Sequence, residues 1–326
     1  MAELIQHRSR DVDDQAQALS GWQQHYEQLS CGRFQGELWQ AVLRDGFFVR
    51  ERTNRQLREQ IAPPPDHVVI ALPQAVQPGS VYAGRPLDPD TLMVLSGGRE
   101  VDVLSAGEMD LIGLAVHRRL LEQSLSPQCL EWLLHAEGER NLGLLPEAAQ
   151  AIRRMLHETF GEVGRGLVDA EAAAADDFGA GLLQHALQQA VTLAMCGDRN
   201  GPQGWSAPRR ADTRLKVVQR AIRFMREHLD QEIGVADICA AACASRRSLQ
   251  YCFEEFLHTT PQAYLRALRL NEARRALKAS RDPAAKPITE LATTLGFSSA
   301  SHFTRHYKAM FDELPSETLR QHPPLS

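Results

Sequence analysis

The sequence lacks an uninterrupted run of about 18 apolar residues, the length that a membrane-crossing helix needs. Its first residues, MAELIQHRSRDVDDQAQ, also lack the cationic start and apolar stretch that mark an export signal. The composition, with 43% hydrophobic and 24% charged residues, is ordinary for a folded chain. We therefore expect a protein of the cytoplasm that has no membrane partner.

Cysteine pairs with the C-x-x-C spacing of zinc and redox sites are also absent. The scattered cysteines, which we expect to be reduced, are Cys31, Cys129, Cys196, Cys239, Cys243 and Cys252. Cys239 and Cys243 lie four residues apart on a predicted helix, close enough to share a metal ion. We favour the simpler interpretation that both are small apolar residues on a buried face.

Motifs of hydrolytic and nucleotide-dependent enzymes are missing as well. There is no G-x-S-x-G sequence and no Ser-His-Asp arrangement, and SGGR at residues 96–99 lacks the pattern that surrounds a phosphate-binding loop. His67 and His117 do not form the clustered His/Glu set of a metal centre. We expect no catalytic residue, no cofactor and no metal.

The length and the charge distribution favour two domains. A chain of 326 residues exceeds what one hydrophobic core usually supports. The net charge is −5, but residues 212–320 hold 17 basic and 13 acidic residues, so that this part carries +4 and the rest −9. This asymmetry is compatible with a basic nucleic-acid-binding module joined to an acidic domain.

The N-terminal part is predicted to be rich in strands. From residue 34 to about 117, short apolar runs are separated by turn-forming clusters such as PPPD, QPGS, DPD and SGG. The clearest strands are at residues 68–72, 91–95 and 109–116. Several short strands at close spacing favour an antiparallel barrel or sandwich.

After about residue 118 the apolar pattern takes the helical period. Two amphipathic helices are indicated by Ala151, Ile152, Met155, Leu156 and Phe160, and by Leu182, Leu183, Ala186, Leu187, Ala190, Val191 and Leu193. They would pack on the strands, pair with a second subunit, or do both, so the sequence leaves open whether the protein forms a homodimer. Residues 196–211, CGDRNGPQGWSAPRRA, have no period and are the predicted linker between domains at 1–195 and 212–320.

The C-terminal domain is predicted to be helical and to contain a helix-turn-helix unit. Its first helix carries an apolar stripe of Leu215, Val218, Ala221, Ile222, Met225 and Leu229. In residues 235–256, a short helix is followed by Ser245, the expected N-cap of a second helix. On this second helix the inward residues are Leu249, Cys252, Phe253 and Phe256, and the outward ones are Arg246, Arg247, Gln250 and Tyr251. A recognition helix presents such side chains to the major groove, where Arg pairs with guanine and Gln with adenine.

The same arrangement occurs a second time. Residues 288–297 predict a short helix ending at Gly296, a residue that suits a left-handed turn. Residues 298–308 then predict a second recognition helix, with Phe303, Tyr307 and Phe311 inward. Between the units, residues 261–280 predict a helix of about 30 Å, close to one turn of duplex DNA. Both recognition helices would then enter successive major grooves.

Three segments resemble the AraC/XylS family of transcription regulators. They are SRRSLQYCF (245–253), PQAYLRALRLNEARRAL (261–277) and LGFSSASHFTRHYKAMFDELPSETLR (295–320). The resemblance implies an α+β protein with an N-terminal cupin-like β-barrel with helices, for effector binding and dimerisation, and a C-terminal all-α domain with two helix-turn-helix units. It assigns DNA contacts to Arg246, Arg247, Gln250 and Tyr251, and to Ala300, Ser301, His302, Thr304 and Arg305. Because Ala300 and Ser301 are short, Arg305 is the strongest guanine-reading candidate of the second unit.

The resemblance also implies partners: promoter DNA, RNA polymerase and, in an activator, a small organic effector. A small barrel holds one ligand. Candidate lining residues are Trp39, Phe47, Phe48, Arg50, His67, Tyr82 and Trp132. Two alternatives stay open. One is a regulator controlled by a protein partner, and the other is a cupin enzyme fused to helices, which a cluster of metal ligands would favour.

Overall fold

The computed structural model describes residues 2–19, 21–139, 141–169, 172–199, 209–279 and 288–321. The chain forms two compact units. Unit 1 comprises Met1–Tyr26, Gln35–Asn54 and Arg58–Ser206, and unit 2 comprises Glu27–Phe34, Arg55–Leu57 and Ala207–Ser326. Unit 1 combines strands and helices, whereas the named elements after residue 207 are all helices, so the fold is of the α+β type.

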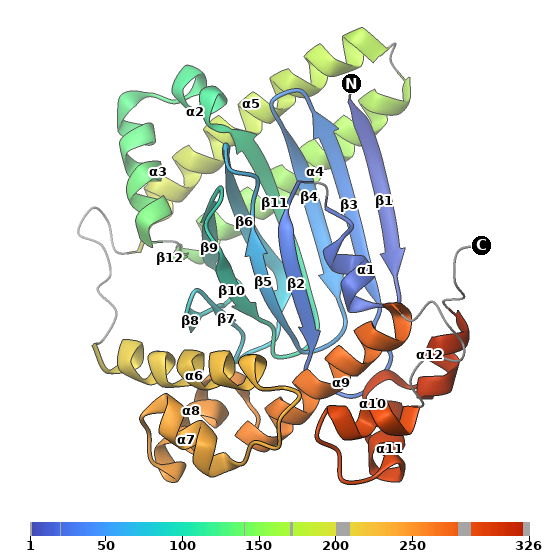
Figure 1. Ribbon diagram of the computed structural model, residues 1–326. Helices are drawn as coiled ribbons and strands as arrows, with labels where there is room; N and C mark the ends of the chain where they lie inside the picture. Colours follow the sequence, from blue (N-terminus) through green and yellow to red (C-terminus); the bar gives the residue numbers. More distant parts are fainter. Residues whose placement is uncertain are drawn as a thin grey trace. The chain divides into compact units, whose positions relative to one another are not determined.

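The strands form two sheets (Figure 1). The first contains β1 (Glu3–Ser9), β3 (Gly36–Leu43), β4 (Gly46–Thr53), β6 (His67–Val76), β9 (Thr91–Ser96), β11 (Met109–His117) and β12 (Asn141–Gly143), in the order β1-β3-β4-β11-β6-β9-β12. The second contains β2 (Gln23–Gln28), β5 (Leu57–Ala62), β7 (Val81–Tyr82), β8 (Arg85–Pro86) and β10 (Val101–Leu104), in the order β2-β5-β10-β7-β8. The strands predicted within β6, β9 and β11 are confirmed. The structure does not confirm a closed barrel, because the described strands are divided between two sheets.

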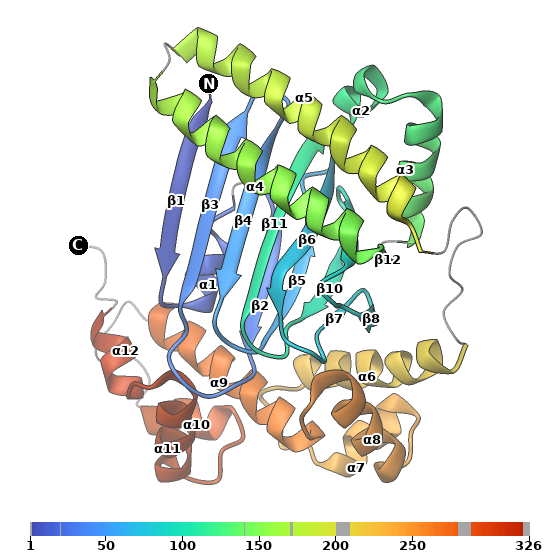
Figure 2. The same ribbon diagram turned by 180° about the vertical axis from the view of Figure 1, so that it is seen from behind.

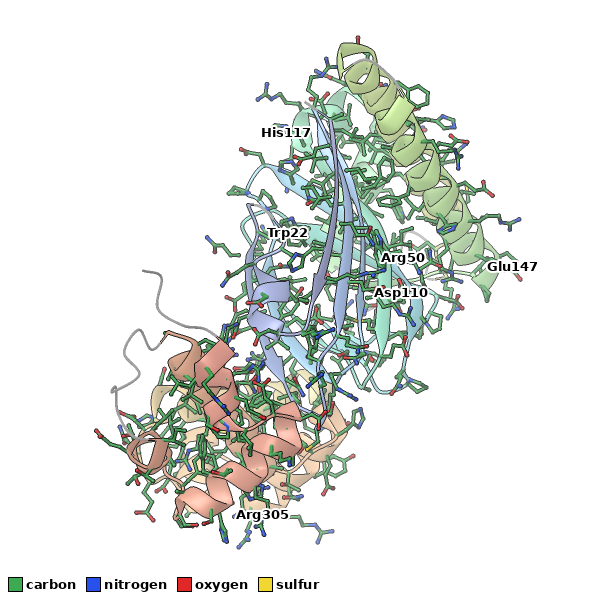
Figure 3. The ribbon with its side chains drawn as sticks, turned by 90° about the vertical axis from the view of Figure 1, so that its right-hand side faces the viewer. Trp22, Arg50, Asp110, His117, Glu147 and Arg305 are labelled. Atoms are coloured by element: carbon green, nitrogen blue, oxygen red, sulfur yellow. The ribbon has the colours of Figure 1, made fainter. Side chains whose placement is uncertain are left out.

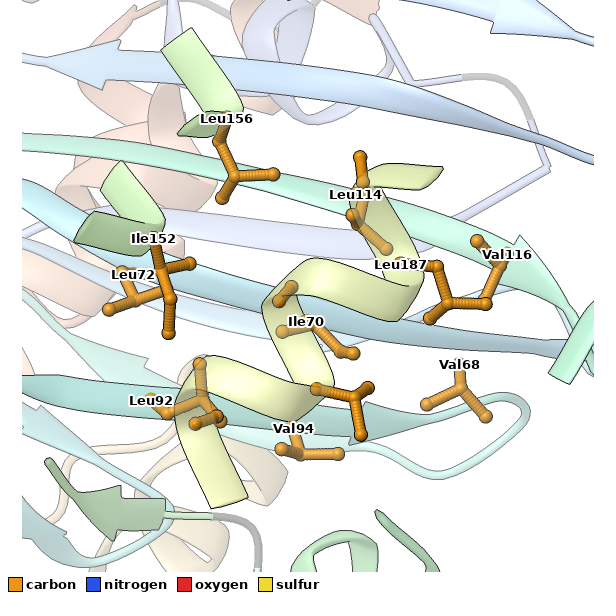
Figure 4. Close-up of a cluster of buried hydrophobic side chains, with 14 of the residues drawn as sticks. Val68, Ile70, Leu72, Leu92, Val94, Leu114, Val116, Ile152, Leu156 and Leu187 are labelled. Atoms are coloured by element: carbon orange, nitrogen blue, oxygen red, sulfur yellow. The ribbon is translucent and has the colours of Figure 1, made fainter. Parts of the chain in front are cut away.

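Helices cover one face of the seven-stranded sheet (Figure 2). They are α2 (Arg118–Ser124), α3 (Pro127–Glu139), α4 (Pro146–Asp169) and α5 (Ala172–Gly197), while the short α1 (Val12–Ala16) follows β1. Figure 4 shows Ile70 and Leu114 of the sheet beside Ile152 and Leu187 of the helices, all in one buried cluster. Because neighbouring residues of a strand point to opposite faces, Val69 faces the other way. The two long predicted helices are therefore confirmed, and their apolar stripes pack on the sheet.

The helices of unit 2 are α6 (Arg209–Glu227), α7 (Val235–Ala242), α8 (Arg246–Leu257), α9 (Pro261–Ala279), α10 (Ile288–Thr294), α11 (Ala300–Phe311) and α12 (Pro315–Gln321). Most of the predicted linker, residues 200–208, lies outside the described residues. In the part of the chain that the structure describes, no helix is both long and apolar enough to cross a membrane.

Unit 2 includes two short segments from the N-terminal half of the chain. The buried carboxylate of Glu27 accepts hydrogen bonds from Arg226 Nη2 at 2.7 Å and from Tyr264 Oη at 3.2 Å. The backbone N–H of Gln28 donates to Asn271 Oδ1 at 3.1 Å, and Asn271 Nδ2 donates to the Gln28 carbonyl at 2.9 Å. Buried polar groups need such partners, so these residues complete the packing of α6 and α9 within unit 2.

Candidate nucleic-acid interface

Helices α7 and α8 form the first helix-turn-helix pair. Cys243 ends α7 in the left-handed conformation, with φ 51° and ψ 46°. Ser245 caps α8 as predicted, because its side chain accepts a hydrogen bond from the backbone N–H of Ser248 at 3.1 Å. The predicted inward residues Leu249, Cys252, Phe253 and Phe256 are all buried. Their burial fixes which face of α8 is turned outward.

The outward face of α8 carries the four predicted DNA-contacting residues. Arg246 and Arg247 are exposed in its first turn. Gln250 Nε2 donates to Glu254 Oε1 at 2.7 Å. Tyr251 is 53% exposed, and Arg214 of α6 lies 5.6 Å from its ring centroid and donates to its hydroxyl at 3.3 Å. The two arginines therefore project freely toward solvent, whereas Gln250 and Tyr251 are held by neighbouring side chains.

Helices α10 and α11 repeat the pair. Gly296 follows α10 with φ 71°, the left-handed conformation predicted for it. Ser299 caps α11 by accepting from the backbone N–H of His302 at 3.2 Å, and the inward residues Phe303, Tyr307 and Phe311 are buried. Outside the core, Ser301, His302 and Arg305 are exposed, and Ala300 and Thr304 are half-buried. Figure 3 shows Arg305 projecting from unit 2 into solvent.

Basic side chains lie close together around His306, next to Arg305. The pKa of His306 is lowered by partial burial and by the nearby basic side chains of Arg266, Arg305 and His302. Arg266, an exposed residue of α9, was missed in the sequence, although its position outside the apolar stripe of α9 could have indicated it. A cluster of this kind favours contact with DNA phosphates.

Helix α9 joins the two pairs within unit 2 (Figure 1). Tyr264, near its start, packs edge-on against Phe253 of α8 with ring centroids 5.7 Å apart. Further along, Leu270 and Leu277 share a buried cluster with Phe303 and Tyr307 of α11. Helix α9 has 19 residues, which corresponds to about 28 Å. Because both recognition helices pack on this one helix, their separation is fixed.

The interpretation of Cys239 and Cys243 as two buried residues is only partly right. Cys239 is half-buried, but Cys243 is exposed at the end of α7. Among the described residues, no group of three or more His, Cys, Asp or Glu side chains is placed to hold a metal ion.

We predict that Cys243→Gly stabilises unit 2 by about 0.5 kcal/mol. Glycine adopts positive φ without a steric cost, which outweighs its greater freedom in the unfolded chain. The gain is measured as slower hydrogen exchange in α7 and α8. Cys243→Ala is the control, since it removes the thiol and keeps the strained Cβ. An equal gain from alanine would show that the thiol, not the backbone, is responsible.

Unit 1 contains a cavity between its two sheets. None of the seven sequence-predicted lining residues borders it. Phe48 lies in the core under the helices, Arg50 pairs with Asp110 at 2.7 Å, and Tyr82 donates to the Val94 carbonyl at 3.0 Å. The four remaining residues also contact other side chains. Trp39 lies under Arg50 and Phe47 lies beside Trp22. His67 packs against His117, and Trp132 Nε1 lies 3.4 Å from Asp198. The prediction of these residues as the lining is therefore wrong for this cavity.

Comparison with known proteins supports a DNA-binding role for unit 2. A family profile described as a helix-turn-helix domain matches residues 238–321. The XylDLEGF operon transcriptional activator of Pseudomonas putida is 38% identical over 105 residues, which are 32% of this chain and 32% of that protein. The probable thc operon regulatory protein of Rhodococcus erythropolis is 36% identical over 107 residues, which are 33% of this chain and 32% of that protein. The chain thus spans about a third of the length of the curated relatives it matches.

A similar solved structure is that of a transcriptional regulator with an AraC-type DNA-binding domain from Chromobacterium violaceum. It is 31% identical, and the match covers 34% of this chain and 96% of that one with a TM-score of 0.31.

Proposed function

We propose that the protein is a sequence-specific transcription regulator of the AraC/XylS type, because residues 238–321 match a helix-turn-helix domain family and 105 residues are 38% identical to an operon transcriptional activator. The observation that supports this best is the pair of recognition helices, α8 and α11, each with a buried aromatic side and an exposed polar side. Both pack on α9, whose 19 residues correspond to about 28 Å, a length close to one duplex turn.

The proposal assigns base reading chiefly to arginine. Arg246 and Arg247 in the first turn of α8, and Arg305 on α11, are exposed and long enough for the bidentate guanine contact. Gln250 would have to leave Glu254 before it could read adenine. Tyr251, held by Arg214, is better placed for a phosphate or a thymine methyl group. Ser301, His302 and Thr304, with Ala300, would add contacts of lower specificity.

Unit 1 is proposed to be the effector-binding domain of an activator. Its cavity lies between two sheets and has a mostly apolar lining, as binding sites for small molecules do. Promoter DNA, RNA polymerase and a small organic effector would then be the partners. A cupin-like relationship of unit 1 and a homodimer are part of the same proposal.

The first test is Arg305→Ala on an operator obtained by binding-site selection. We expect a loss of about 1 to 3 kcal/mol, because one bidentate contact disappears, and relaxed specificity at one base position. The measurement is the dissociation constant on the operator, on its single-base variants and on random DNA.

Lys308→Ala is the matched control, since it removes one exposed charge from the same helix. It should weaken binding to all sequences equally. If Arg305→Ala did the same, base reading by Arg305 would be excluded.

A further inference from the structure

The cavity of unit 1 is bordered by both sheets. Val49 and Glu51 of β4 line it, whereas Phe48 between them belongs to the core under the helices. From the second sheet, Tyr26 and Glu59 reach the same space. Other lining residues are apolar and include Leu19, Ile61, Val69, Ala71, Met93, Leu95 and Leu111. The site therefore has apolar walls and a small group of polar side chains that both sheets contribute.

That polar group contains two carboxylates. Glu59 is 1% exposed, and Glu51 is half-buried. Glu51 accepts hydrogen bonds from Gln15 Nε2 at 2.8 Å and from Tyr26 Oη at 3.2 Å. Desolvation and the charge of Glu51 raise the pKa of Glu59 well above its usual range, and desolvation also raises the pKa of Glu51. Burial and the neighbouring carboxylate therefore both favour the protonated form of Glu59.

Three buried polar atoms of this lining have no hydrogen-bond partner: Trp22 Nε1, Gln24 Oε1 and Glu59 Oε1. Nearly all buried polar atoms in folded proteins are satisfied, and an orphaned atom costs stability. If this cluster only supported the fold, the structure would be expected to pair these atoms with one another. The oxygens of Gln24 and Glu59 are acceptors and the Trp22 N–H is a donor. A ligand that offers two donors and one acceptor would satisfy all three.

We propose that the cavity binds a small primary amine as its ammonium ion, with Glu59 as the counter-ion. An ammonium group has three donors, which suits Glu59 and Gln24, while the indole N–H of Trp22 would meet an acceptor on the ligand. This inference rests on the proposed function, because it names the chemical class of the effector that unit 1 would bind.

The size of the cavity restricts the ligand. Its volume is about 50 Å³. A water molecule needs roughly 10 to 15 Å³ on the same measure, so the cavity takes about four non-hydrogen atoms without rearrangement. Propylamine, propan-1-ol and propionate have about this size and differ in charge. They are the probes for the test.

The experiment is isothermal titration calorimetry of the full chain with these three probes. We expect propylamine to bind with a dissociation constant on the order of 1 mM or lower, and propan-1-ol and propionate to bind at least about tenfold more weakly, because a buried carboxylate needs a cation. Glu59→Gln should weaken propylamine binding at least about tenfold. Glu122→Gln, which changes an exposed acid of α2, is the matched control and should have no effect.

Proton release provides a readout that a merely structural residue would not change. Burial and Glu51 raise the pKa of Glu59, and an adjacent ammonium ion would lower it, so binding should release protons at pH values between the pKa of the free and the bound protein. The release is seen as a dependence of the binding heat on the buffer, and affinity should rise as the pH rises through the elevated pKa. Tyr26 and Glu51 face the same site, so Glu51→Gln should reduce the release and Glu59→Gln should remove most of it.

Equal binding of propan-1-ol and propylamine, or no binding of propylamine, would overturn the proposal. Melting curves of the variants establish that they fold. DNA binding is measured separately on the same samples. A chain that binds its operator but no amine refutes only this inference, and one that binds amine but no DNA refutes the proposed function.

Discussion

Replacing both Arg247 and Arg305 by alanine is expected to abolish specific operator binding. Each arginine is exposed on a different recognition helix. A bidentate guanine contact contributes about 1 to 3 kcal/mol. Contributions from separate sites add, so the pair should cost about 2 to 6 kcal/mol, or roughly 30-fold to 20,000-fold in affinity. Folding should be nearly unaffected, because substitutions at exposed positions usually change stability by about 0.5 kcal/mol or less.

Genome-wide DNA binding of the intact chain and of the double variant is the measurement. We expect discrete peaks beside one operon for the intact chain and none for the variant. The control is Arg119→Ala with Arg154→Ala, two exposed positions of unit 1 that remove the same charge. This control should keep the peaks. A double variant that kept the same peaks would show that recognition lies elsewhere on unit 2.

The helix-turn-helix pairs were predictable because their signals are local. Ser245 stands immediately before α8, and Gly296 lies in the turn before α11. The period of Leu249, Cys252, Phe253 and Phe256 decides which face of α8 is buried. Each signal extends over only a few residues, so tertiary contacts had little opportunity to override it.

Neither the cavity of unit 1 nor the inclusion of N-terminal segments in unit 2 was predictable from local signals. Glu59 lies in a short strand beside the polar residues Arg58 and Gln60, where the sequence does not mark it as buried, and the charge of Glu51, which affects its ionisation, comes from a strand of the other sheet. Gln28 and Asn271 are 243 residues apart in sequence but exchange two hydrogen bonds. Neither pairing leaves a periodic signal in the sequence.

Arg226→Met should destabilise unit 2 by about 3 kcal/mol. Arg226 donates at 2.7 Å to Glu27, whose side chain is 3% exposed. Removing the cation takes the Arg226 ion pair from a buried carboxylate, and breaking a buried pair costs about 3 to 5 kcal/mol at fully buried sites. We expect the lower end, because the Arg226 side chain is 26% exposed. Hydrogen exchange in α6 and α9 of the full chain is the measurement, since it reports unit 2 without assuming two-state unfolding.

The second substitution Glu27→Gln separates charge burial from lost packing. If the penalty comes from the buried negative charge that has lost Arg226, Arg226→Met with Glu27→Gln should be more stable than Arg226→Met alone, because the amide is neutral and still accepts from Tyr264 Oη. Arg223→Met, an exposed position on the same helix, is the control and should change exchange little. Equal protection in the single and double variants would mean that the stem of Arg226, and not its charge, stabilises unit 2. Recovery in the double variant would establish that a residue from the N-terminal strand β2 is electrostatically part of the DNA-binding unit.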